Sequence, residues 1–160
     1  MLNRAHTSDE HNIDIRSPED TRNRKDGARQ SASADSGKKI LYIEDERALS
    51  VVMSNKLNRS GFTVSLAADG IEGLRKIENE SPDLVLLDLI LPNKDGWEVL
   101  KDMQKKGFIK KIPVIIMSNL GQSSDIVKSI KLGAVDYIIK SDLSINEVIK
   151  KINTQLEKRK

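Results

Sequence analysis

The sequence predicts an α/β fold in which a parallel sheet of five strands is covered by helices on both faces. Short runs rich in valine, isoleucine and leucine alternate with longer segments of helical period, giving five βα units in about 120 residues. The runs are almost continuously apolar, as strands buried on both faces must be. They are KILYI (39–43), TVSL (63–66), DLVLL (83–87), PVIIM (113–117) and YII (137–139).

Each segment that follows a run carries an apolar face at helical spacing. Gly61 and Gly133 are placed to end the first and fourth helices, because glycine tolerates the left-handed conformation of a helix end. In the last helix Ser144 and Glu147 have the spacing of a capping box. The predicted faces are Leu49, Val52, Met53 and Leu57; Ile71, Leu74 and Ile77; Val99, Leu100 and Met103; Ile126, Val127 and Ile130; and Ile145, Val148, Ile149, Ile152 and Leu156.

The composition changes near residue 38. Residues 1–37 are rich in arginine, aspartate, serine and asparagine, and their isolated apolar residues show no period. Such a segment cannot bury enough apolar surface to offset the entropy lost on ordering. We therefore expect a disordered tail over 1–37 and one folded domain over 38–160.

The residue counts exclude several kinds of site. There is no cysteine, and the only histidines, His6 and His11, lie in the tail, so the folded part has no thiolate metal site or histidine-based catalysis. The net charge of +3 comes from interspersed residues, and aromatic residues are scarce, so direct DNA binding is not expected. No signal peptide and no apolar run of about 18 residues is present, which predicts a cytoplasmic protein with no membrane contact.

Acidic, hydroxyl and basic side chains follow four of the five predicted strands. Glu44 and Asp45 follow the first strand, Asp88 the third, Ser118 the fourth and Lys140 the fifth. The carboxyl ends of parallel strands share one edge of the sheet, where open α/β folds bind ligands. Any one of these residues alone would be a solvated loop residue or a helix cap. Their recurrence on four strands favours a site.

This set of side chains favours phosphoryl transfer. Three carboxylates brought within a few ångströms repel one another unless a cation neutralises them, and oxygen ligands on an open site suit Mg²⁺. A metal ion and Lys140 facing Asp88 would together neutralise a transferring phosphoryl group. Asp88 would be the nucleophile and would form an aspartyl phosphate, and Ser118 could donate a hydrogen bond to the phosphoryl oxygen.

The segments ILYIEDE, PDLVLLDLILPNKDGWEVL, PVIIMSN and GAVDYIIK resemble the receiver domain of bacterial two-component response regulators, over residues 38–158. The resemblance implies a flavodoxin-like (βα)5 fold with strand order 2-1-3-4-5. It implies that Asp88 accepts a phosphoryl group from a phosphohistidine on a sensor histidine kinase or a histidine phosphotransfer protein. The switch that follows would be read by a downstream protein through about residues 122–158.

The resemblance also implies individual roles for the site residues. Lys140 and Ser118 would contact the phosphoryl oxygens, and Tyr137 would change rotamer as Ser118 moves. The Mg²⁺ ligands would be Glu44, Asp45, Asp88 and the backbone carbonyl of Ile90.

The sequence departs from the family pattern at several positions. Ser141 follows the lysine where the family usually has proline in a cis peptide, and a cis bond before another residue costs about 3 kcal/mol. Whether the Lys140–Ser141 peptide is cis is left open. Asn119 replaces a typical alanine, and Glu44 replaces the commoner aspartate.

Two apolar residues flank the expected phosphoryl position. Ile90 and Leu120 stand where polar residues could orient a water molecule. Our hypothesis is that their apolar character slows hydrolysis of the phosphorylated form.

We expect a stand-alone, chemotaxis-type single-domain regulator whose output is a protein contact, a phosphorylation-dependent homodimer or a step in a phosphorelay. It would be no enzyme beyond its own phosphoryl transfer and slow autodephosphorylation. The alternative is a pseudo-receiver that binds partners without phosphorylation. A haloacid dehalogenase-type phosphatase is disfavoured, because its second acid would fall at Ile90.

Overall fold

The computed structural model describes residues 37–160, so the predicted tail lies outside the described residues except for Gly37. Five strands form one sheet in the order β2-β1-β3-β4-β5, and every neighbouring pair is parallel. This confirms the predicted fold class and strand order. The strands are β1 (Lys39–Ile43), β2 (Thr63–Ala67), β3 (Leu84–Leu87), β4 (Val114–Ser118) and β5 (Asp136–Ile139).

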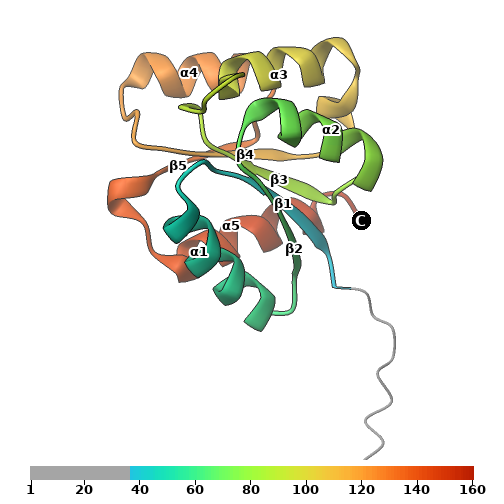
Figure 1. Ribbon diagram of the computed structural model, residues 1–160, viewed down its shortest axis with the longest axis vertical. Helices are drawn as coiled ribbons and strands as arrows, with labels where there is room; N and C mark the ends of the chain where they lie inside the picture. The colour runs from blue at the N-terminus through green and yellow to red at the C-terminus, as the bar shows by residue number, and fades with distance from the viewer. Residues whose placement is uncertain (1–36) are drawn as a thin grey trace, which may run out of the picture. The chain divides into compact units, whose positions relative to one another are not determined.

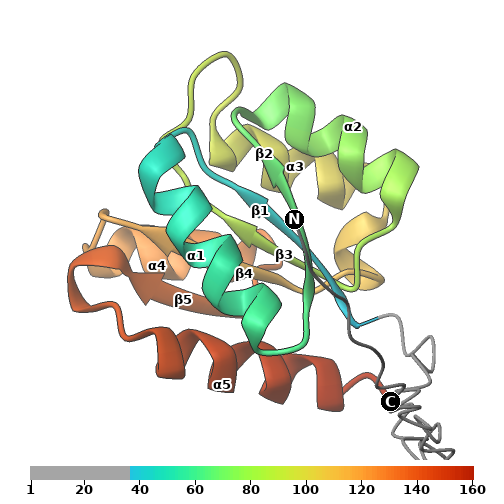
Figure 2. The ribbon, with the colours of Figure 1, turned by 60° about the horizontal axis from the view of Figure 1, so that its bottom comes forward.

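Helices cover both faces of this sheet. Figures 1 and 2 show α1 and α5 on one face and α2, α3 and α4 on the other. None of the helices among residues 37–160 is long and apolar enough to cross a membrane. The helices are α1 (Arg47–Arg59), α2 (Gly70–Glu80), α3 (Gly96–Lys105), α4 (Ser123–Lys131) and α5 (Ile145–Glu157), with short 3-10 turns η1 (Phe108–Lys110) and η2 (Lys140–Asp142).

The sheet separates two apolar clusters. Alternate residues of β1 point to opposite faces, so Leu41 and Ile43 join the cluster beneath α2 and α3, whereas Ile40 and Tyr42 join the cluster beneath α1 and α5. Every residue of β3 is fully buried. Burial on both faces therefore explains why the strands have no polar alternation.

Four residues predicted to face the core are instead largely exposed. They are Val52, Ile71, Val127 and Ile130, with exposed fractions between 46% and 56%. In α1 the buried face runs through Ser50, Met53, Ser54 and Leu57. The two serines can be buried because each hydroxyl donates to a carbonyl one turn back in the helix.

The predicted capping box was placed on the wrong helix. Ser144 is the N-cap residue of α5, but its side chain makes no capping hydrogen bond. A complete capping box is formed instead by Asp95 and Glu98 at the start of α3. Gly61 and Gly133 have positive φ angles at the ends of α1 and α4, as predicted.

Candidate functional site

The strand register brings the predicted site residues to one edge of the sheet. Ile43 pairs with Leu87, so Glu44 and Asp88 emerge side by side from the ends of β1 and β3. The backbone N–H of Asp88 donates to the carbonyl of Ile43 at 3.1 Å, which extends the pairing to the site itself. Asp88 is only 4% exposed, so this residue is buried even though it follows the end of its strand.

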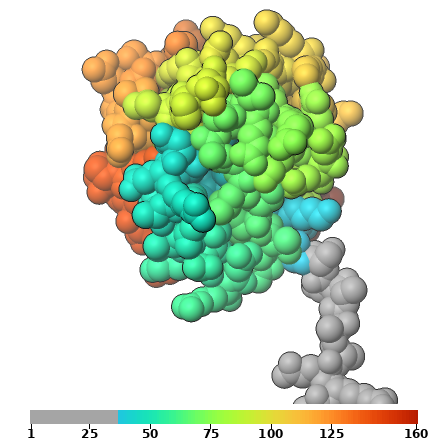
Figure 3. Space-filling view, in the orientation of Figure 1, coloured from blue at the N-terminus to red at the C-terminus, as the bar shows by residue number. Residues whose placement is uncertain are grey.

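A cleft of about 390 Å³ opens at this edge. In the space-filling view, the segment after β1 adjoins the yellow-green segment that follows β3 (Figure 3). Four of the predicted site residues and Ile90 line the cleft, whereas Ser118 and Tyr137 do not. The lining residues are Glu44, Asp45, Glu46, Asp88, Ile90, Asn119 and Lys140.

Lys140 connects the end of β5 to both buried carboxylates. Its Nζ lies 2.6 Å from Asp88 Oδ2 and 2.5 Å from Glu44 Oε2. Burial alone lowers the pKa of Lys140, but hydrogen bonds to Asp88 and Glu44 outweigh it, so the net pKa is raised. The ammonium group therefore stays charged at neutral pH. Although Ser141 replaces the usual proline, Lys140 is directed into the site.

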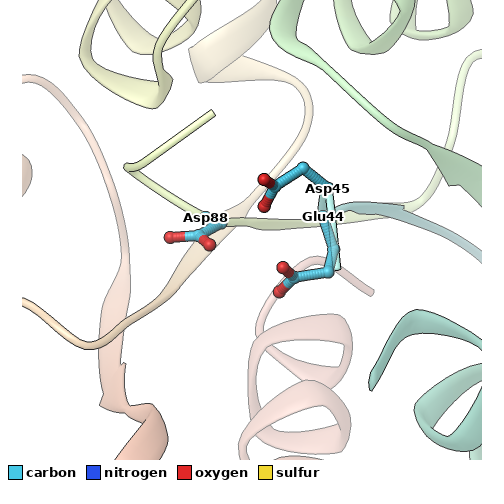
Figure 4. A group of neighbouring side chains, drawn as sticks. All are labelled: Glu44, Asp45 and Asp88. Carbon is cyan, nitrogen blue, oxygen red and sulfur yellow. The ribbon is translucent and has the colours of Figure 1, made fainter. Parts of the chain in front are cut away.

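The carboxylates of Glu44, Asp45 and Asp88 each offer an oxygen within 4.8 Å of the others. Figure 4 shows the three side chains, two after β1 and one after β3. Glu44 and Asp88 are buried, whereas Asp45 is exposed. An all-oxygen set with one open side fits Mg²⁺, which keeps several water ligands and takes only a few carboxylates from the protein.

The backbone around Ile90 holds Asp88 from the other side. The N–H of Ile90 donates to Asp88 Oδ1 at 3.1 Å, so the two carboxylate oxygens have different partners. The side chain of Ile90 is 57% exposed at the cleft. The role of its carbonyl as a metal ligand stays a prediction.

Glu44 is held by an interaction that the sequence reasoning missed. The hydroxyl of buried Tyr42 donates to Glu44 Oε2 at 2.9 Å, and the N–H of Glu46 donates to Oε1 at 3.1 Å. Burial, followed by the charge of Glu44, raises the pKa of Tyr42 far above its usual range, so its hydroxyl remains a donor. The signal was present in the sequence, because residues two apart on a strand share a face.

Ser118 and Tyr137 lie beside the cleft and are linked through Leu120. Ser118 is fully buried, and its Oγ accepts a hydrogen bond from the Leu120 N–H at 3.3 Å. The hydroxyl of Tyr137 donates to the Leu120 carbonyl. Burial raises the pKa of Tyr137. One loop after β4 thus contacts both residues predicted to move together.

Known proteins share this architecture and sequence pattern. The family described as response regulator receiver domain matches residues 40–153. The chain is 38% identical over 117 residues to the alkaline phosphatase synthesis transcriptional regulatory protein PhoP of Bacillus subtilis (strain 168), which covers 72% of this chain and 48% of PhoP. The chain thus spans about half the length of this curated relative.

Solved receiver structures superpose closely on the described residues. The receiver domain of Francisella response regulator 1452 is 29% identical with a TM-score of 0.73, and the match covers 78% of this chain and 100% of that one. A chain in the CheX-CheY-BeF3-Mg+2 complex from Borrelia burgdorferi is 27% identical with a TM-score of 0.68, covering 73% of this chain and 87% of that one.

Proposed function

This chain belongs to the response regulator receiver domain family, and on that premise we propose that Asp88 is its phosphoryl acceptor. The observation that carries the proposal is the pairing of Asp88 with Lys140 at 2.6 Å inside a group of three carboxylates. Phosphoryl acceptance is the general function of this domain. Asp88 and Glu44 each have the Lys140 ammonium on one oxygen and a backbone N–H on the other. The Glu44 oxygen beside Lys140 also accepts from the Tyr42 hydroxyl, so Asp88 is the less encumbered nucleophile of the two.

In the proposed reaction, an Asp88 carboxylate oxygen attacks the phosphorus of a phosphohistidine while the phosphorus–nitrogen bond breaks and the imidazole leaves. Lys140 offsets the charge on the phosphoryl oxygens, as positioned cations do in phosphoryl transfer. Glu44, Asp45 and Asp88, with the carbonyl of Ile90, would hold Mg²⁺, which supplies further neutralisation of that charge. The hydroxyl of Ser118 would then turn from the Leu120 N–H toward the phosphoryl group.

The proposed readout surface comprises α4, β5 and α5, about residues 122–158. Val127 and Ile130 of α4 are 51% and 46% exposed. Among the described residues, this apolar pair is left largely open to solvent. Tyr137 would couple the site to this face, because its hydroxyl contacts the loop that also holds Ser118. A local change of charge would thereby bias a packed surface.

The proposed partners are a histidine kinase or histidine phosphotransfer protein upstream, and a protein target or a second phosphorylated copy downstream. PhoP is named as a transcriptional regulatory protein, and this chain spans about half its length. The expectations of a stand-alone regulator, without direct DNA binding and in the cytoplasm, therefore remain predictions. We also propose that the domain catalyses only its own phosphorylation and slow dephosphorylation.

Incubation with acetyl phosphate and Mg²⁺, followed by intact mass measurement, tests the proposal. The expected gain is one phosphoryl group, abolished by a chelator and by Asp88→Asn. Asp83→Asn is the matched control. Asp83 lies just before the same strand, and its side chain accepts a hydrogen bond from the backbone N–H of Lys39 at the other end of the strands, away from the site. Absence of the gain with acetyl phosphate and with a phosphorylated histidine donor would favour the pseudo-receiver.

A further inference from the structure

We propose that Tyr42 is a positioning residue for the metal site, holding Glu44 so that only its Oε1 faces the bound ion. The inference rests on the proposed function of the site. It assigns a role to a residue that contacts neither phosphate nor metal. The role acts through one hydrogen bond, from the Tyr42 hydroxyl to Glu44 Oε2 at 2.9 Å.

Tyr42 approaches Glu44 from inside the core. Its side chain is fully buried in the cluster beneath α1 and α5, with Met53, Leu57 and Val148. A buried tyrosine hydroxyl needs a hydrogen-bond partner, and among the described residues Glu44 supplies it. Because the ring is packed on all sides, the hydroxyl is a fixed anchor for the carboxylate.

The hydrogen bonds to Glu44 leave little of its carboxylate free. A carboxylate has about four lone-pair sites, two on each oxygen. Oε2 accepts from Tyr42 and from Lys140, so both of its sites are used. Oε1 accepts from the N–H of Glu46. One site on Oε1 remains for a metal ion or a metal-bound water molecule.

The length of the side chain matters for this arrangement. Residues 42 and 44 lie two positions apart at the end of β1, so their side chains start from the same face of the sheet. Glutamate spans the distance from that backbone position to both the Tyr42 hydroxyl and the Lys140 ammonium. Aspartate is one methylene shorter and would lose the contact with Tyr42. The departure from the commoner aspartate is therefore matched by the tyrosine.

The experiment measures the Mg²⁺ dissociation constant by calorimetry, with the phosphorylation rate by acetyl phosphate measured separately at saturating Mg²⁺. We expect Tyr42→Phe to weaken Mg²⁺ binding about tenfold, as loss of a hydrogen bond behind a metal ligand commonly does. The rate at saturating Mg²⁺ should stay within about twofold of the original, because the ligand set is intact once filled. Ser54→Ala is the control, since it removes a buried hydroxyl that bonds only its own helix.

A second variant separates positioning from packing. Glu44→Asp should weaken Mg²⁺ binding, and adding Tyr42→Phe to it should change the dissociation constant less than about twofold, because the contact is already lost. If Tyr42→Phe does not fold, Glu44→Asp alone carries the test.

The outcomes distinguish the inference from the function on which it rests. If the wild-type protein neither binds Mg²⁺ nor is phosphorylated, the proposed function is overturned. If the wild-type protein binds Mg²⁺ and Tyr42→Phe binds it equally well, only the role of Tyr42 is overturned. Equal binding by Glu44→Asp would also overturn that role.

Discussion

Lys140 Nζ lies 2.6 Å from Asp88 Oδ2 and so ties the end of β5 to the end of β3, across the intervening strand β4. The same ammonium group contacts Glu44 after β1. One cation thus balances two buried carboxylates from two strands. This arrangement places the ammonium group beside the carboxylate that we propose as the nucleophile, where it can offset the charge of a phosphoryl group.

Replacement of Lys140 tests this pairing. Lys140→Met keeps an unbranched side chain that is one heavy atom shorter and removes its charge, and we expect the phosphorylation rate by acetyl phosphate to fall about 100-fold. Lys151→Met is the matched control, because Lys151 forms an ion pair with Asp136 on the flank of β5 at 2.9 Å. A rate for Lys140→Met within twofold of the original would contradict the role of the ammonium group.

Mg²⁺ should stabilise the folded protein. Binding to the folded state alone raises the free energy of unfolding by about 2.7 kcal/mol at a Mg²⁺ concentration 100 times the dissociation constant. Chemical denaturation with and without Mg²⁺ measures the effect. Asp45→Asn should abolish it, whereas Glu80→Gln, at an exposed position on α2, should leave it unchanged. Stabilisation that survives in Asp45→Asn would place the ion elsewhere.

The side chain at position 90 should set the lifetime of the phosphorylated form. Ile90 is 57% exposed at the cleft, and an amide in its place could orient an attacking water molecule. We expect Ile90→Gln to speed dephosphorylation several-fold, measured as decay of the phosphorylated mass after removal of the donor. The control is Ile71→Gln on α2, since Ile71 is 56% exposed and lies outside the cleft. A decay rate equal to that of the control would reject the hypothesis.

Asp69 should contribute to stability in a pH-dependent way. It caps α2, accepting the Glu72 N–H at 2.8 Å, and also accepts from Asn93 in the loop after β3. The hydrogen bond from Glu72 is the main cause that lowers the pKa of Asp69 below its ordinary value of 3.8. Because the folded-state pKa is the lower one, the stabilisation is present above about pH 3.8 and is lost as pH falls through the folded pKa.

Two variants measure that contribution. Asp69→Ala should lower the free energy of unfolding at pH 7 by about 1 kcal/mol, as loss of an N-cap does. Asp69→Asn keeps a cap acceptor but cannot ionise, so its stability relative to the original protein should rise as pH falls below about 3.8. A pH-independent difference would show that the charge of Asp69 has no effect.

The sequence predicted the sheet and most of the site because both depend on strong local patterns. Continuous apolar runs identified all five strands, and the residues after them identified Glu44, Asp45, Asp88 and Lys140, which the register then brings together. The exposed face of α4 was predicted wrongly. Helical spacing shows that Val127 and Ile130 share a side of the helix, but not whether another element covers that side.

Other features depended on contacts that the sequence does not specify. Tyr42 was predicted only as part of the buried strand over 39–43, because the partner of its hydroxyl is defined only by the fold. Ser144 and Glu147 have the spacing of a capping box, yet the reciprocal hydrogen bonds form at Asp95 and Glu98. Spacing shows which residues can form a cap, and the path of the preceding loop decides which of them do.

The most direct test of the central claim is to locate the phosphoryl group by reducing the acyl phosphate with borohydride, which converts the phosphorylated aspartate to homoserine. Protein treated with acetyl phosphate and Mg²⁺ would be reduced, digested and sequenced by mass spectrometry. The account predicts homoserine at position 88 and at no other aspartate. Homoserine at Asp45, or at another aspartate with position 88 unchanged, would contradict it.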